Sequence, residues 1–232
     1  MRVIAHRGSS ARAPENTLLA FRAALEDGAD GVELDARLTA DGVVVVMHDD
    51  DVARVTNGVG RISEMSFEQL GSVLVRGSEP VPTLEEILDV VGGRVDVVVE
   101  IKGAFGGARD VPGDEVARAV VPLIAGVPSV LVSSFDPAAV AYVRAVAGEI
   151  PTAITIGGHA DLDETISLAL SAGHREVHLP DARVSPSFVE RAHDAGLAVL
   201  AFTVNEAARA RELEAMGIDG IFSDDPSGVR LH

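Results

Sequence analysis

The sequence contains no cysteine and no tryptophan, and aromatic residues make up only 3% of it. Without cysteine the chain forms no disulfide and supplies no thiolate for catalysis. Its apolar runs are all shorter than the ~20 residues that a membrane-spanning helix needs, so we expect no stable membrane insertion. No charged segment followed by an apolar one opens the chain, as it would in a secretory signal. We therefore expect a cytoplasmic protein.

Basic residues are scarce as well. The chain has 19 lysines and arginines against 36 aspartates and glutamates, which gives a formal net charge of −17 at pH 7. A surface this acidic repels nucleic acid and anionic membranes, so neither is an expected partner. If the substrate is an anion, something local must reverse this field, and a bound cation is the obvious candidate.

What the chain does have is enough apolar material for a large core. Apolar residues make up 47% of its 232 positions. This length fits one large domain or two small ones. We predict a single domain over residues 1–232, with a small irregular insertion at 51–80.

The second half of the chain repeats a helix-and-strand unit. Each helical pattern ends at a glycine, and a short apolar run follows it; these glycines are Gly126, Gly148, Gly173, Gly196 and Gly217. Gly28 and Gly92 mark two earlier helix ends. With the opening strand, the units predict eight parallel strands, the number in a TIM (β/α)8 barrel. A doubly wound sheet is the alternative, but it usually has fewer strands and a glycine-rich loop after the first.

One further strand is predicted at Val43–Met47. Only about five residues separate it from the strand before it, whereas a parallel crossover needs a dozen or more, so the two form an antiparallel hairpin. If Thr39 pairs with Gly42, this hairpin places His48 opposite Glu33. A slip of one residue in the register would undo that placement.

Ionisable side chains gather where the first strands end. Seven residues share this position: His6, Arg7, Glu33, Asp35, His48, Glu100 and Lys102. Each alone has an ordinary explanation, such as a solvated strand edge, a polar cap or a cross-face ion pair. Because the carboxyl ends of barrel strands meet at one face, we expect all seven to lie together there.

Three of the seven are carboxylates, namely Glu33, Asp35 and Glu100. At a spacing of ~4 Å and an effective dielectric near 20, each pair repels by several kcal/mol. One lysine and one arginine do not obviously cancel this repulsion, whereas a divalent cation would. An all-oxygen set of ligands favours Mg²⁺ or Ca²⁺ over zinc, so the expected cofactor is one such cation.

Two histidines are left over, His6 and His48. Two histidines beside a cation and two basic residues indicate phosphodiester cleavage. Arg7 and Lys102, with the cation, would hold the non-bridging oxygens. One histidine would deprotonate the nucleophile and the other would protonate the leaving alkoxide, each worth about 10²–10⁴ in rate. The pattern does not say which histidine does which.

These residues belong to motifs that resemble a known family, the glycerophosphodiester phosphodiesterases. Five motifs occur in order: His6-Arg7-Gly8, Pro14-Glu15-Asn16-Thr17, Glu33-Leu34-Asp35, His48-Asp49 and Glu100-Ile101-Lys102. Further similar segments at 133–136, 203–205 and 219–224 extend the resemblance over nearly the whole chain. Any one motif is weak, but five in order are specific.

The resemblance implies a TIM-barrel phosphodiesterase, related in architecture to phosphatidylinositol-specific phospholipase C. Its expected partner is a small-molecule glycerophosphodiester, hydrolysed to an alcohol and glycerol 3-phosphate. By this likeness the acid–base pair is His6 and His48. The phosphate contacts are Arg7 and Lys102. The metal ligands are Glu33, Asp35 and Glu100. Segment 51–80 is the family's insertion, which caps the mouth of the site and looks short here.

The chain departs from the family at one place. The family commonly carries a tryptophan beside the glycerol, where this sequence has Phe202. Phe202 keeps an apolar wall there, and Phe135 is a second candidate for it; ordinary barrel core is the alternative for both. The remaining histidines are expected to be structural: His159, His174, His178, His193 and His232. Of these, His178 is the least certain because it lies on a strand.

Other functions remain open. The same barrel would also suit a lysophospholipase D-like or cyclising phosphodiesterase that acts on lysophospholipids. A non-catalytic barrel that binds a cation or a phosphodiester is a third possibility, although a pure binding module needs no pair of histidines. The head group of the substrate, the choice between Mg²⁺ and Ca²⁺ and the oligomeric state are not encoded in any pattern we recognise.

Overall fold

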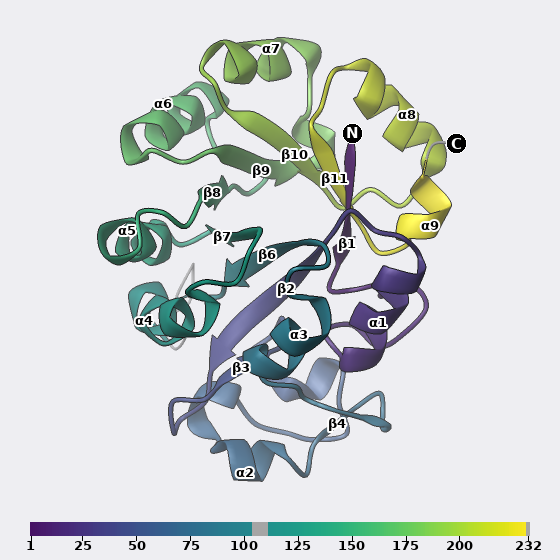
Figure 1. Cartoon of the computed structure of the whole chain (residues 1–232), viewed down its shortest axis with the longest axis vertical. Coiled ribbons are helices and arrows are strands. Elements are labelled where there is room, and N and C mark those ends of the chain that lie inside the picture. The colour runs from purple at the N-terminus through teal and green to yellow at the C-terminus, as the bar shows by residue number, and fades with distance from the viewer. Residues whose placement is uncertain (104–110, 231–232) are drawn as a thin grey trace.

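The computed structural model describes residues 1–103 and 111–230, so His232 lies outside the described residues. Strands follow one another around a ring in the order β1, β11, β10, β9, β8, β7, β6, β2, and β2 pairs again with β1 (Figure 1). Every neighbouring pair in this ring is parallel. The described residues therefore form a closed eight-stranded barrel with helices outside it, which confirms the predicted TIM barrel and excludes the doubly wound sheet.

The barrel strands are short and alternate with helices. The strands are β1 (Arg2–His6), β2 (Gly31–Leu38), β6 (Asp96–Ile101), β7 (Val130–Ser134), β8 (Thr152–Thr155), β9 (Glu176–Pro180), β10 (Ala198–Phe202) and β11 (Gly220–Ser223). The outer helices are α1 (Leu18–Glu26), α3 (Leu84–Val91), α4 (Gly113–Ile124), α5 (Pro137–Val146), α6 (Leu162–Ala172), α7 (Pro186–Asp194), α8 (Ala207–Ala215) and α9 (Pro226–Val229).

Apolar side chains fill both the barrel and the layer beneath the helices. Inside the barrel, a cluster is contributed by different strands: Ile4, Val98, Leu131, Ala153, Leu200 and Phe222. Because successive side chains of a strand point to opposite faces, the alternate residues pack outward against the helices. This packing closes the lower barrel and leaves the carboxyl ends of the strands for polar groups.

Glycines end most of the helices as the sequence predicts. A glycine with positive φ follows each of α1, α4, α6, α7 and α8. Two details of the prediction differ. Gly148 follows α5 without a positive φ, and after α3 the left-handed residue is Gly93, because Gly92 still closes the helix by donating its N–H to the carbonyl of Leu88.

The extra strand β3 (Val44–Val46) pairs with β2 in the antiparallel sense, as predicted, but in a different register. The N–H of Thr39 donates to the carbonyl of Val43, where the prediction paired Thr39 with Gly42. The Thr39 hydroxyl accepts the N–H of Val43, which stabilises a turn one residue longer. The predicted pairing of His48 opposite Glu33 is therefore wrong, and His48 lies in the loop that follows β3.

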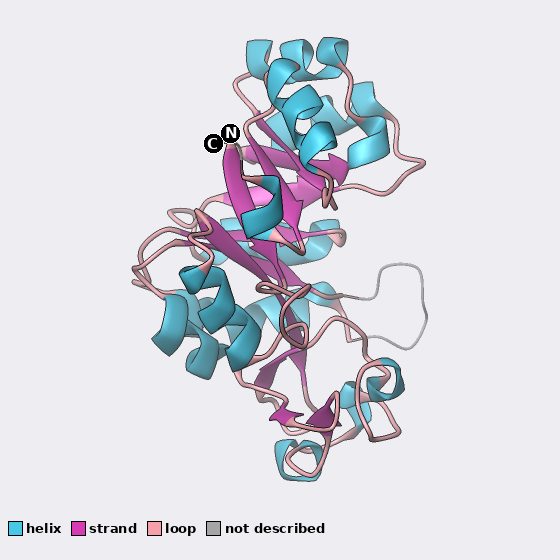
Figure 2. Ribbon diagram, turned by 90° about the vertical axis from the view of Figure 1, so that its right-hand side faces the viewer, coloured by secondary structure: helices cyan, strands magenta, loops and turns pink. Residues whose placement is uncertain are grey.

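Residues 51–80 form a small lobe beside the barrel, at the bottom of Figure 1 and Figure 2. The sequence suggested only irregular chain here, but short elements are present: η1 (Val52–Arg54), η2 (Ile62–Glu64), α2 (Phe67–Leu70), β4 (Leu74–Val75) and β5 (Glu79–Pro80). The lobe has its own apolar cluster, which includes Val52, Ile62 and Leu70. It packs on Val45 of β3 and on Met47, the residue after β3, which belong to the same cluster.

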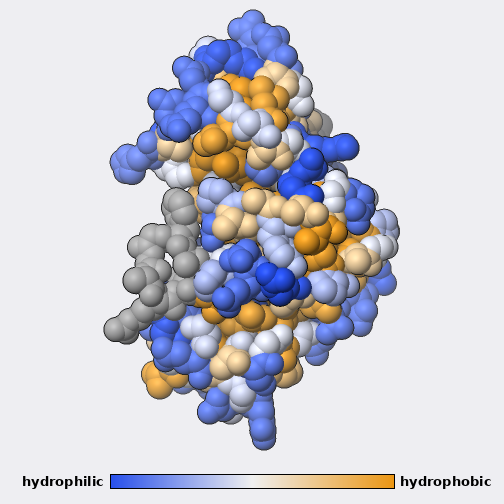
Figure 3. All heavy atoms as spheres, turned by 90° about the vertical axis from the view of Figure 1, so that its left-hand side faces the viewer, coloured by the Kyte–Doolittle hydropathy of each residue, from blue (hydrophilic) through white to orange (hydrophobic). Residues whose placement is uncertain are grey.

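Figure 3 shows one side of the molecule, on which apolar groups appear as separate areas between hydrophilic side chains and not as one continuous patch. In the described ranges, the helices are all too short or too polar to cross a bilayer.

Candidate active site

A cavity of about 140 Å³ lies where the barrel strands end. One side of it, which we term the ionic half, comes from β1, β2, β6 and the loop after β3. Its residues are His6, Arg7, Glu33, His48, Glu100 and Lys102, with Asp35 buried among them. The other side, which we term the far half, comes from β7 to β11. Its residues are Ser133, Phe135, Thr155, His178, Phe202 and Phe222.

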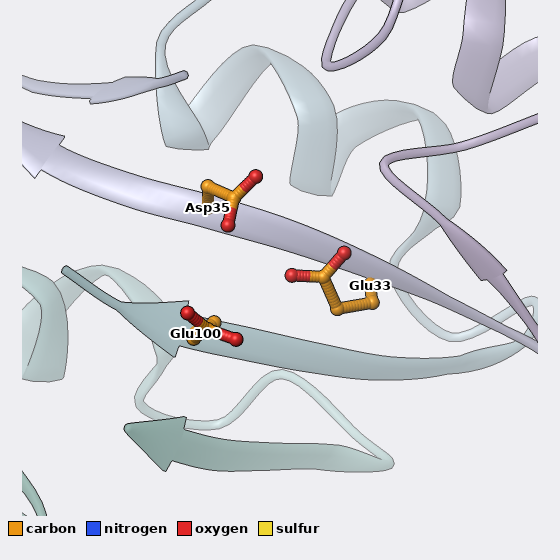
Figure 4. Close-up of side chains that lie close together, drawn as sticks. All are labelled: Glu33, Asp35 and Glu100. Carbon is orange, nitrogen blue, oxygen red and sulfur yellow. The ribbon is translucent and has the colours of Figure 1, made fainter. Parts of the chain in front are cut away.

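The three predicted carboxylates lie together in the ionic half. Glu33 and Asp35 are two residues apart on β2 and so share a face, and the parallel register sets Asp35 beside Glu100 on β6. Each residue offers an oxygen within 4.8 Å of the other two (Figure 4). Asp35 is only 1% exposed, and Glu33 is buried as well. Such a cluster of buried anions is expensive unless cations balance it.

Two side-chain cations partly balance these carboxylates. Lys102, the residue after β6, forms ion pairs with Glu100 and with Asp35, whose Oδ1 lies 2.8 Å from Nζ. Arg7, the residue after β1, places Nε 3.2 Å from Oδ2 of Asp35 and Nη1 2.9 Å from Glu15. Burial alone would lower the pKa of Lys102, but the neighbouring carboxylates raise it above its ordinary value. Both basic groups are therefore charged at neutral pH.

The balance is incomplete, because three carboxylates face two cations. Burial alone would raise the pKa of Asp35, but Lys102 and Arg7 hold it well below its usual range. Glu33 shows the opposite result: burial, together with the charges of Asp35 and Glu100, raises its pKa well above the ordinary value. No well-directed hydrogen bond from a described residue reaches Oδ1 of Asp35. This all-oxygen donor set fits a hard divalent cation.

Both predicted histidines line the cavity, each fixed by an aspartate. Nδ1 of His6 lies 2.7 Å from Oδ1 of Asp224, and Nδ1 of His48 lies 2.6 Å from Oδ1 of Asp49. Since Nδ1 is engaged in both rings, Nε2 is the nitrogen left to meet a ligand. Burial lowers the pKa of His48, which favours its neutral form. His48 lines the cavity from the loop after β3, although the predicted register of β2 with β3 was wrong.

Comparison with known proteins shows which family this chain belongs to. The sequence model of the glycerophosphoryl diester phosphodiesterase family matches residues 6–227. The chain belongs to this family. It is 34% identical over 238 residues to YhdW of Bacillus subtilis, with 99% of this chain and 96% of that protein covered. It is 32% identical to a glycerophosphodiester phosphodiesterase of Caldanaerobacter subterraneus, with coverage of 97% and 94%.

Solved structures agree. A phosphodiesterase of Oleispira antarctica, in complex with the product sn-glycerol-3-phosphate, matches with a TM-score of 0.89 at 29% identity and covers 99% of this chain and 95% of its own. A glycerophosphodiester phosphodiesterase of Thermotoga maritima matches with a TM-score of 0.82 at 26% identity, with coverage of 97% and 95%. The chain is thus an enzyme of the phosphodiesterase class.

Several residues that support the site of this phosphodiesterase were not singled out from the sequence. Asp224, which holds His6, follows β11; it lies in the similar segment at 219–224, but no role was predicted for it. Asn16 donates from Nδ2 to Oδ2 of Asp35 at 2.7 Å. Glu15 accepts from Arg7 and also from Arg54 of the lobe. Glu15 and Asn16 lie in a recognised motif, but only the fold shows which groups they contact.

The far half contains the predicted aromatic wall and one surprise. Phe202 and Phe135 pack edge to face with ring centroids 6.0 Å apart, and both line the cavity. His178, grouped with the structural histidines from the sequence, lines the cavity too. The signal was its place two residues after Glu176 on an apolar strand, the same i, i+2 spacing that Glu33 and Asp35 show.

Proposed function

We propose that this phosphodiesterase hydrolyses glycerophosphodiesters to an alcohol and sn-glycerol 3-phosphate, with one divalent cation, Mg²⁺ or Ca²⁺. The proposal rests on one observation: three carboxylates, two histidines and two cationic side chains lie together around one cavity. The product held by the structural neighbour from Oleispira antarctica supports the choice of substrate. In this proposal residues 1–232 act as one catalytic domain.

Glu33, Asp35 and Glu100 are the proposed ligands of the cation. Their oxygens lie close enough to share one ion, and the unbalanced negative charge in the cluster favours its binding. When bound, the cation would polarise a phosphoryl oxygen as a Lewis acid.

Arg7 and Lys102 are proposed to contact the non-bridging oxygens of the phosphate. Both line the cavity and both are held in place by ion pairs with the cluster. Their fixed positive charges are therefore already aimed at the place where negative charge grows during the reaction, which is the arrangement that lowers a barrier most effectively.

His6 and His48 are the proposed acid–base pair. One imidazole removes a proton from a water molecule whose oxygen forms the new bond to phosphorus. The other gives a proton to the alcohol oxygen as its bond to phosphorus breaks, so the proton count balances. The aspartates that hold each Nδ1 support this role because they fix the orientation of both rings.

The lobe and Phe202 are proposed to shape the two ends of the substrate. Arg54 of the lobe binds Glu15 and Asp49, which themselves hold Arg7 and His48. This link supports a lobe that caps the mouth of the site on the alcohol side. Phe202 is proposed as the apolar wall beside the glycerol.

The test is release of glycerol 3-phosphate from glycerophosphocholine and glycerophosphoethanolamine by metal-stripped protein, before and after Mg²⁺ or Ca²⁺ is added. We expect release only with a cation, and a fall of about 10²–10⁴ in rate for His48→Ala. His174→Ala is the matched control, since His174 is buried, binds Thr152 and lies away from the cavity. A cyclic phosphate product, or no release with any cation, would contradict the proposal.

A further inference from the structure

One residue of the far half carries a buried hydroxyl group that finds no partner in the part of the chain that the structure describes. Thr155, the last residue of β8, lines the cavity and is only 4% exposed. Its Oγ1 has no hydrogen-bond partner among residues 1–103 and 111–230. Buried polar groups in native proteins are nearly always paired, so an unpaired hydroxyl on a residue that lines a cavity points to a polar ligand there.

His178, on the neighbouring strand β9, is the second polar group of this wall. Its ring is 2% exposed and packs edge to face on Phe222, with centroids 4.9 Å apart. Nε2 of the ring lies 3.1 Å from Oε2 of Glu176. The other oxygen of Glu176 accepts a hydrogen bond of 2.7 Å from Nη2 of Arg2, at the opposite end of the barrel.

This chain of contacts decides which nitrogen of His178 carries the proton. The hydrogen bond from His178 and the charge of Arg2 outweigh the burial of Glu176 and hold its pKa down at about 2, so it is a carboxylate. A carboxylate only accepts hydrogen bonds, so Nε2 of His178 carries the proton. In the neutral ring Nδ1 is then a lone-pair acceptor.

We propose that Thr155 and His178 form a hydroxyl-binding subsite, with Glu176 and Arg2 as the positioning residues that keep Nδ1 of His178 ready to accept a hydrogen bond. The inference rests on the proposed function in one respect: the hydroxyl bound there is one of the free hydroxyls of the glycerol moiety. The ionic half is built for charged groups of a ligand, whereas this wall offers one hydroxyl and one imidazole nitrogen beside phenylalanine rings.

The subsite makes the enzyme select substrates whose glycerol is free. An acylated glycerol, as in a lysophospholipid, replaces a hydroxyl donor by an ester, which leaves the acceptor of His178 unpaired. Sites built to hydrogen-bond a hydroxyl reject analogues that lack it far more strongly than apolar pockets reject an extra group. The cavity, at about 140 Å³, is also small beside the 300–1,000 Å³ of typical ligand pockets.

The first experiment compares two substrates in Thr155→Val and His178→Phe. Glycerophosphocholine carries the free hydroxyls, and bis(4-nitrophenyl) phosphate is a phosphodiester without them. We expect kcat/KM to fall about 10- to 100-fold for the first and by less than about 3-fold for the second. Thr152→Val is the matched control, because it removes a buried hydroxyl from the same strand outside the cavity. Equal losses on both substrates would mean a structural role and overturn the inference.

A binding measurement separates this inference from the proposed reaction. Calorimetry with Mg²⁺ present compares sn-glycerol 3-phosphate with inorganic phosphate. We expect the wild type to prefer glycerol 3-phosphate, and Thr155→Val to weaken its binding about 10-fold while that of phosphate stays the same. If no phosphodiester is hydrolysed but this contrast appears, the proposed function fails and the subsite stands. If the contrast is absent, the subsite is overturned whatever the activity.

The positioning role has its own test. Glu176→Leu removes the acceptor of the Nε2 proton, whereas Glu176→Gln keeps a carbonyl oxygen that accepts it. We expect Glu176→Leu to raise KM for glycerophosphocholine about 10-fold with kcat nearly unchanged, and Glu176→Gln to restore most of that loss. A KM equally poor in both variants would contradict the proposed tautomer.

Discussion

The two halves of the cavity are built from the same kind of strand but carry opposite kinds of side chain. The ionic half concentrates carboxylates, cations and two histidines on β1, β2, β6 and the loop after β3. The far half, on β7 to β11, has hydroxyls, phenylalanines and one histidine. The fold thus separates charge, where the proposed chemistry takes place, from neutral groups, where we propose that the substrate is recognised.

The halves also differ in how their polar groups are satisfied. In the ionic half Lys102 and Arg7 compensate Asp35, yet the pKa of Glu33 stays raised because Glu33 is buried and because Asp35 and Glu100 add negative charge beside it. In the far half Thr155 lacks any partner within the described ranges. One half is therefore short of positive charge and the other is short of a hydrogen bond, and a cation and a hydroxylated ligand would supply the two.

The largest effect is expected on cation binding, when a central carboxylate of the ionic half is replaced. Asp35→Asn removes one negative charge from the cluster, and we expect Mg²⁺ or Ca²⁺ to bind about 100-fold more weakly or worse. Calorimetry with the metal-stripped protein measures this. Asp50→Asn is the matched control: Asp50 is also buried and pairs with Arg61 of the lobe at 2.6 Å, but it does not line the cavity. Unchanged affinity in Asp35→Asn would remove the basis for a cation at this cluster.

A smaller effect, on kcat, is expected when a residue that follows a strand of the far half no longer holds a histidine of the ionic half. Asp224 follows β11, a strand of the far half, yet it holds His6 of the ionic half. We expect Asp224→Asn to lower kcat about 30-fold without weakening cation binding, because it disturbs the orientation of one histidine only. Asp219→Asn is the comparison, since Asp219 holds His193 away from the cavity. A loss of cation affinity in Asp224→Asn would contradict this division of roles.

The smallest expected effect concerns stability beneath the far half. We expect Glu176→Gln to lower the free energy of unfolding by about 1.5 kcal/mol at pH 7, because Arg2 and His178 lose a charged partner. The pKa of Glu176 is about 2 in the folded protein, below its ordinary 4.5. Its contribution is therefore complete above about pH 4.5 and is lost as the pH falls toward 2.

Urea unfolding of wild type and Glu176→Gln at pH 7, 5 and 3 tests this dependence. The difference between the two proteins is expected to stay constant from pH 7 to 5 and to shrink at pH 3. A difference that does not change with pH would show that the charge of Glu176 contributes nothing to stability.

Much of the ionic half was accessible from the sequence because its residues share a local pattern. Apolar runs that end in charged residues mark the carboxyl ends of strands, and in a barrel all such ends meet. The i, i+2 spacing of Glu33 and Asp35 alone places both on one face. The predicted register of the hairpin was wrong because of one side chain: the hydroxyl of Thr39 accepts a backbone N–H and lengthens the turn.

The far half was only partly predicted, because some of its signals are weak or distant. Phe202 and Phe135 were expected as an apolar wall, whereas Thr155 looks like an ordinary strand residue in the sequence. The role we propose for His178 depends on Glu176 and, through it, on Arg2 near the start of the chain. Contacts between residues so far apart follow from the closure of the barrel and leave no mark in local periodicity.

The sequence by itself thus determined the alternation of strands and helices, the barrel and the ionic residues, since each follows from short-range hydrophobic patterning and from the polarity of strand ends. Only the tertiary structure decided which of these residues face one another. It alone brought Asp224 to His6 and Arg2, through Glu176, to His178. The physical reason is that hydrogen bonds and ion pairs depend on distance in space, which the closed barrel sets across the whole length of the chain.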